Sequence, residues 1–284
     1  MSYITSHRSR ALTTPWPPPR RGGELAWRLP SLVRRGWGWL AERCRVGVLL
    51  ISLPAAMLAF SLGASPQESA GGPSPVNVDD EGVFVISMAG GPVGSERFKI
   101  HSSPGGVEAR GEIRLSIEKN GRTVSVESFP DLVMDTQLRP LTYSWRLHGP
   151  KASRLEVDFR VRPARVRYHT INGSEDDRDF DLPPDVVVLD DNVIHHFQLI
   201  AARFQAMGAG KQTLRVFVPQ EALPSLLTVE DLGISATQDR SAASGLRHLL
   251  ISTDVTHVDL WVDDKLHVQR VSVPAAQLEA VRKN

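Results

Sequence analysis

Apolar and polar residues alternate over most of the chain, which is the pattern of a strand with one buried face. In RLEVDFRVR the apolar side chains all fall on one side: Leu155, Val157, Phe159 and Val161. LTYSWRL and ARVRYHT repeat the pattern, and five further strand candidates follow residue 210. Asn120-Gly121 lies between two such runs and predicts a two-residue hairpin. We therefore expect roughly eleven strands in an antiparallel sheet.

One segment, VVVLDDNVIHHFQLIAARF at 186–204, follows a helical period instead. Its apolar positions fall within one arc of a helix: Val193, Phe197, Ile200 and Phe204. Asp190 is a good N-cap residue and Gly208 a good residue to end a helix. The pattern predicts an amphipathic helix over 191–207.

The same segment holds the residues of this chain that most resemble a reactive site. On a helix the neighbours His195 and His196 diverge by about 100°, so His195 is expected in solvent and His196 at the edge of the apolar face. Asp191 and His195 have the i, i+4 spacing of a helical metal pair. We favour the aspartates as the start of the helix; the alternative is a metal or acid/base site of Asp191, His195 and His196.

A single helix of this length cannot cover the apolar face of so many strands. An uncovered apolar face would aggregate, so the sheet must curl around the helix. We predict a mainly β fold: a large curved antiparallel sheet, half-barrel or barrel-like, with the helix packed on its apolar face. Such a curled sheet commonly leaves an interior groove for an apolar ligand.

Four aromatic side chains on inward positions fill the core or line that groove: Tyr143, Trp145, Phe159 and Tyr168. Trp261 shares its strand face with polar residues, which makes it a candidate interface residue. The acidic run at 175–181 is expected to be a solvated loop, with calcium binding as the alternative. The sequence indicates no cofactor.

The amino-terminal part has the composition of an export signal. Residues 1–45 carry nine arginines against two glutamates, and an uncharged apolar run follows at 46–63. We expect 1–63 to be a signal peptide or signal-anchor, 64–80 a flexible linker and 81–284 a single β domain. The protein is then periplasmic or secreted, or anchored in the inner membrane if the signal is retained. The single cysteine, Cys44, lies before the apolar run.

Residues 46–284 carry 24 basic and 30 acidic side chains, a net charge of −6. Nucleic-acid binders concentrate positive charge in the folded part, so this composition argues against nucleic acid as a partner.

Three stretches carry a resemblance to known proteins: FVISMAGGPVGSERFKI, DTQLRPLTYSW and LWVDDKLHVQRVSVP. Through them, residues 82–282 resemble poorly characterised secreted bacterial proteins built from one large curved antiparallel sheet, similar to periplasmic lipoprotein-carrier half-barrels. The resemblance implies handling of an apolar ligand or a lipoprotein in the envelope, without a catalytic motif.

The sequence thus favours an exported, non-enzymatic envelope protein that binds or shields an apolar ligand, such as a lipid, in a curved-sheet groove. The first alternative is an envelope assembly or scaffold module that acts through protein contacts. The second is a metal-dependent hydrolase that uses Asp191, His195 and His196.

Overall fold

The structure is a computed structural model that describes residues 78–119, 122–149, 152–170, 173–208, 210–235, 245–253 and 256–283. The expected export signal and nearly all of the expected linker lie outside the described residues, as does Cys44.

Fifteen strands form one continuous sheet in the order β8-β7-β6-β5-β4-β3-β2-β1-β15-β14-β13-β12-β11-β10-β9. All neighbouring strands are antiparallel except β9 and β10, which are parallel. The bounds are β1 Asp80–Met88, β2 Gly91–Ser103, β3 Gly106–Lys119, β4 Arg122–Met134, β5 Pro140–His148, β6 Ser153–Asp158, β7 Ala164–Thr170, β8 Glu175–Phe180, β9 Val187–Val188, β10 Gln212–Val218, β11 Leu223–Ser235, β12 Leu246–Ser252, β13 His257–Val262, β14 Val268–Val273 and β15 Leu278–Arg282.

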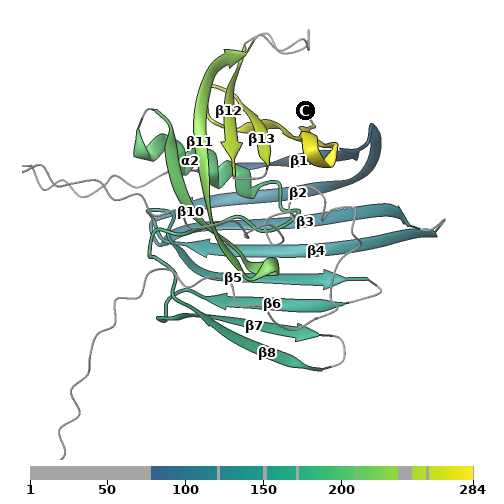
Figure 1. Cartoon of the computed structure of the whole chain (residues 1–284), viewed down its shortest axis with the longest axis vertical. Coiled ribbons are helices and arrows are strands. Elements are labelled where there is room, and N and C mark those ends of the chain that lie inside the picture. Colours follow the sequence, from purple (N-terminus) through teal and green to yellow (C-terminus); the bar gives the residue numbers. More distant parts are fainter. Residues whose placement is uncertain are drawn as a thin grey trace, which may run out of the picture.

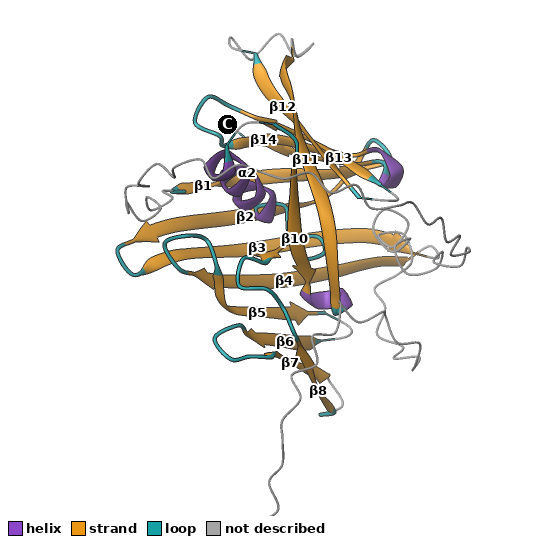
Figure 2. Cartoon of the chain, turned by 60° about the vertical axis from the view of Figure 1, so that its left-hand side comes forward, coloured by secondary structure: helices purple, strands orange, loops and turns teal. Residues whose placement is uncertain are grey.

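The sheet curls until its two halves cross. In Figures 1 and 2, β1–β8 lie one beside the next, and β10 and β11 run across them. Side chains rather than strand pairing join the two ends: the ring of Phe217 on β10 lies 5.1 Å from that of Phe180 on β8 and 6.3 Å from that of Phe159. The hydroxyl of Tyr168 donates to the carbonyl of Pro219 over 2.9 Å. The predicted fold, a large curved antiparallel sheet of the half-barrel or barrel-like kind, is confirmed.

Helix α2, His196–Met207, lies inside the curl and is buried at eight of its residues: His196, Phe197, Gln198, Leu199, Ile200, Ala201, Ala202 and Phe204 (Figure 2). The Gln198 side chain accepts the N–H of Val268 and donates to the carbonyl of Leu266, each over 2.8 Å. Arg203 donates to the carbonyl of Gln137 in the β4–β5 turn over 2.7 Å. The helix is therefore tied to both halves of the sheet. Within the described part of the chain, no helix is long and apolar enough to span a membrane.

Two predictions were wrong: the residue at which the helix begins, and the loop conformation of the acidic run. The helix was expected over 191–207, but residues 191–195 form turns and the helix begins at His196. The acidic run at 175–181 was expected to be a loop, but most of it forms the edge strand β8. Its carboxylates pair with basic groups on β7, as in Arg167–Asp177 over 3.2 Å, and this cross-strand pairing stabilises a strand without apolar alternation.

The expected hairpin is confirmed by the pairing of Lys119 with Arg122.

Gly111 on β3 makes room for the residue that precedes α2. A Cβ atom at Gly111 would lie 2.8 Å from Cε1 of His195 and 3.0 Å from Cγ of Pro130. Real Cβ atoms do not approach other atoms this closely, so a side chain at this position would displace the His195 ring.

The first prediction follows from this contact. Gly111→Ala should lower the free energy of unfolding of the full chain by about 1–3 kcal/mol, because the methyl group overpacks the interior. The control is Gly91→Ala, whose Cβ would have its nearest neighbour at 3.8 Å. Denaturant unfolding of both variants measures the difference; equal stability of the two would show that the interior adapts freely at His195.

Candidate functional site

A buried carboxylate, Glu96 on β2, holds the chain where it enters α2. Its side chain accepts the N–H of Ile194 over 2.7 Å and the N–H of His195 over 2.9 Å. The Nδ1 atom of the His195 ring is hydrogen-bonded to the same carboxylate. Glu96 and His195 are both 0% exposed. The helix start is thus fixed by a residue of the sheet, across about a hundred residues of sequence, and not by a neighbouring cap.

Glu96 is inward-facing because it has the strand parity of Phe98 and Ile100, which are also buried. The ring of Phe98 stacks on that of His195 at 5.8 Å, with an angle of 2° between the planes. Sequence reasoning missed Glu96. Its signal was a charged residue on the apolar side of an alternating strand, where a buried partner is required.

Asp190 forms a second buried group instead of the expected helix cap. It accepts the hydroxyl of Tyr143 over 2.5 Å and the N–H of Gln220 over 2.9 Å. Burial raises the pKa of Asp190 to about 6, against the opposing effect of these hydrogen bonds. Burial and the charge of Asp190 raise the pKa of Tyr143 well above its usual value. Tyr143 therefore stays protonated and donates to Asp190.

The two histidines are both buried, so the expectation that His195 points to solvent was wrong. Nδ1 of His196 accepts the N–H of Asp190 over 3.1 Å, which leaves the proton on Nε2. Burial lowers the pKa of His196 well below its usual value. Nε2 of each histidine is buried without a hydrogen-bond partner among the described residues. In that part of the chain no three or more His, Cys, Asp or Glu side chains are grouped as a metal site.

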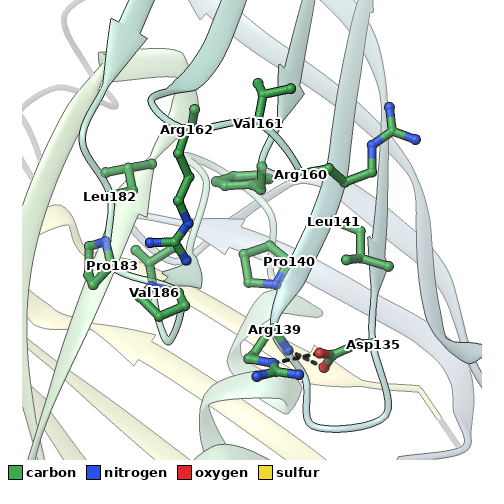
Figure 3. A pocket seen from close by; sticks show the side chains of 13 residues that line it. Asp135, Arg139, Pro140, Leu141, Arg160, Val161, Arg162, Leu182, Pro183 and Val186 are labelled. Carbon is green, nitrogen blue, oxygen red and sulfur yellow. Dashed lines mark hydrogen bonds and ion pairs between the residues drawn. The ribbon is translucent and has the colours of Figure 1, made fainter.

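The open space of interest lies at the rim of the sheet (Figure 3). This rim pocket has a volume of about 250 Å³. It lies between the β4–β5 turn, the β6–β7 connection and the segment that leaves β8 for the interior. Nine of its lining residues are apolar: Pro140, Leu141, Phe159, Val161, Ala164, Leu182, Pro183, Pro184 and Val186. By contrast, the space beside Asp190 and Phe197 at the start of α2 measures only about 20 Å³.

Three arginines and one aspartate complete the lining of the rim pocket. Nε of Arg139 donates to Asp135 over 2.6 Å. Arg160 donates through Nε and Nη2 to the carboxylate of Asp158, each over 2.9 Å. Arg162 has no hydrogen-bond or ion-pair partner among the described residues. In Figure 3 its side chain extends into the space between Pro140 and Pro183, whereas Arg160 points away from it.

The structure separates the aromatic candidates. Phe159 lines the rim pocket. Tyr143 and Trp145 are buried in the core, and the partly buried Tyr168 binds the β10–β11 turn. The candidate interface residue Trp261 is partly exposed, but its ring stacks on His248 at 4.9 Å and lies 4.8 Å from the guanidinium of Arg270 on the opposite neighbouring strand. Its two faces are thus already in contact with neighbours.

Comparison with one solved structure supports the fold. The chain is similar to the crystal structure of a beta-barrel-like protein of the domain of unknown function DUF1849 from Brucella abortus, with a TM-score of 0.52 and 8% identity over 74% of this chain and 97% of that one. A DUF1089 family protein from Pseudomonas aeruginosa aligns with a TM-score of 0.40 and 14% identity over 61% of this chain and 87% of that one. No family model and no curated protein matches the sequence.

The second prediction concerns the buried carboxylate. Glu96→Ala leaves two backbone N–H groups and a histidine ring without their acceptor, so it should lower the free energy of unfolding by about 3–5 kcal/mol. The control is Glu81→Ala: Glu81 has a 73% exposed side chain 3.6 Å from Lys99, and its loss should cost less than about 1 kcal/mol. Losses of similar size in denaturant titrations would contradict a stabilising role for Glu96.

The third prediction is a pH dependence. Burial, with the nearby charges of Asp190 and Glu221, raises the pKa of Asp191 from 3.8 to about 7. Between these two pH values, Asp191 holds a proton in the folded chain that it has lost in the unfolded chain. Its contribution to stability is therefore full below about pH 4 and is lost as the pH rises through about 7. Asp191→Asn removes the titration.

The free energy of unfolding of Asp191→Asn, relative to that of the unsubstituted protein, should therefore rise by about 2–3 kcal/mol between roughly pH 5 and pH 8. Denaturant unfolding at both pH values measures it. A difference that stays constant with pH would show that Asp191 titrates normally.

Proposed function

We propose that this protein is an exported, non-enzymatic binding protein of a bacterial envelope, and that it holds the apolar part of a small ligand in the rim pocket. The observation that carries the proposal is the pocket itself. It opens at the ends of the strands, and its lining joins nine apolar residues to three arginines and one aspartate, with polar groups making up the larger part of its exposed surface. Such a mixed lining can hold the apolar part of a ligand and position its polar part.

The rim supports binding better than the interior of the curl does. Helix α2 and the buried cluster around Glu96 and Asp190 occupy the interior, and the space next to them holds about 20 Å³. The rim pocket of about 250 Å³ is larger by an order of magnitude. At about 30 Å³ per water-sized group it admits roughly eight heavy atoms. A short alkyl chain, or the end of a longer one that projects into solvent, has this size.

Burial also favours binding over catalysis. The acid and histidine side chains that could transfer protons are enclosed: Asp190 is 4% exposed and His195 is 0% exposed. A general acid or base must come within hydrogen-bond distance of its substrate, which these positions do not offer without opening the fold. The export component rests on the arginine-rich flank and the apolar run at 46–63.

The fourth prediction tests both components. The full chain is expressed in a Gram-negative bacterium, and protein from the periplasmic fraction is weighed by mass spectrometry and titrated with octanol by NMR. We expect a chain processed near residue 63 and saturable binding. Val161→Trp should fill the rim pocket and weaken binding roughly tenfold.

The control is Val281→Trp, which adds the same side chain at an equally exposed valine on β15, since Val161 and Val281 are both 43% exposed. It should leave octanol affinity unchanged. Recovery of only unprocessed, cytoplasmic protein would refute export. Absence of saturable binding, or equal effects of the two tryptophans, would refute ligand binding in the rim pocket.

A further inference from the structure

We propose that the ligand of the rim pocket carries an acidic headgroup, a carboxylate or a phosphate monoester, and that Arg162 binds it. This inference rests on the proposed function, because it assigns the polar end of a ligand whose apolar end that function places in the pocket. The three arginines of the lining are not equivalent, and their contacts show which one can bind a ligand.

Arg160 is already satisfied. Two of its nitrogens bind the carboxylate of Asp158, and the backbone N–H of Arg160 donates to the same group over 3.0 Å. In Figure 3 its guanidinium points away from the space between Pro140 and Pro183. A bidentate pair of this kind uses the directional donors that would otherwise recognise an anion.

Arg139 is partly satisfied. Its Nε binds one oxygen of Asp135, while the other oxygen accepts the backbone N–H groups of Gln137 and Arg139 over 2.8 and 3.0 Å. Burial raises the pKa of Asp135, but the hydrogen bonds from Arg139 and Gln137 outweigh this effect. The pKa of Asp135 therefore lies below its usual value. The carboxylate therefore stays charged and is committed to the turn. Arg139 is held at the edge of the pocket and adds little net charge.

Arg162 is the uncompensated cation. It extends across an apolar space lined by Pro140, Leu182 and Pro183, and none of the described acidic side chains pairs with it. Because Asp135 compensates Arg139 and Asp158 compensates Arg160, the pocket keeps one unpaired positive charge, that of Arg162. Arg162 is exposed, so a ligand can reach its guanidinium from solvent, and the planar fork of this group matches a carboxylate or a phosphate. A cationic headgroup would be repelled, and a neutral one would leave the charge unpaired.

The combination selects an anionic amphiphile. Its tail contacts Phe159, Leu141 and Val186, and its headgroup lies at the mouth where Arg162 can donate two parallel hydrogen bonds. Carboxylates and phosphate monoesters share this chemistry, so the test includes one probe of each kind.

The experiment compares four ligands with the same alkyl chain at neutral pH: octanoate, octyl phosphate, octanol and octylamine. Binding to the full chain is measured by NMR titration. We expect at least one of the two anions to bind about tenfold more tightly than octanol, with the advantage falling as salt is added. Octylamine should bind more weakly than octanol. The anion with the larger advantage identifies the source of the headgroup.

Arg162→Gln should abolish the preference for anions while keeping the affinity for octanol. Arg160→Gln, the matched control two residues away, should keep the preference. Denaturant unfolding checks that both variants remain folded. Equal affinity for octanol and the anions would overturn this inference while the proposed function stands, whereas no binding of any probe would overturn the proposed function itself. Equal losses in the two variants would show a diffuse positive field and refute the role of Arg162.

Discussion

The architecture depends on the contact between Glu96 and the chain entering α2. A curled sheet of fifteen strands presents a concave apolar face, and α2 covers its centre. The first N–H groups of a helix lack intrahelical acceptors, and burying them unpaired is costly. Here the N–H groups of Phe197 and Gln198 donate to the carbonyls of Ile194 and His195, in the turn before the helix. The carboxylate of Glu96 holds this turn by accepting its two N–H groups and binding the ring of His195. One side chain therefore satisfies the helix entry and sets its position on the sheet, while Gly111 provides the space for the ring.

The same arrangement explains why the open space is at the rim. After β8, the chain forms one wall of the rim pocket with Leu182 and Val186. It then continues through β9 and reaches Asp190 in the interior. Asp190 is fixed there by Tyr143 and Gln220 from opposite halves of the sheet. Among the described residues, the space beside Asp190 and Phe197 at the start of α2 measures only about 20 Å³. The larger rim pocket lies where this segment crosses the strand ends.

The sequence predicted the strands and the curl well because both follow from patterns that local physics imposes. Alternation identified β5, β6 and β7, and the mismatch between one helix and many strands required the sheet to curl. The helix start was misplaced because Asp190 and Asp191 have the sequence features of a cap, whereas the real acceptor, Glu96, lies far away in sequence. The edge strand β8 was missed because charge pairing across strands, not apolar alternation, stabilises it. The rim pocket joins three connections, and no local pattern reports their proximity.

The open ends of the sheet give the rim pocket its character. A closed barrel satisfies every strand edge by hydrogen bonds, but here β8 and β9 end the order and the halves meet through Phe217, Phe180 and Phe159. Edge strands invite pairing with other chains unless they are charged, and the acidic and basic groups of β7 and β8 meet this need. The seam between the ends is therefore apolar inside and charged outside. The rim pocket lies next to this seam: Phe159, which contacts Phe217 across it, is part of the pocket lining, and Arg162 of the β6–β7 connection adds the unpaired cation.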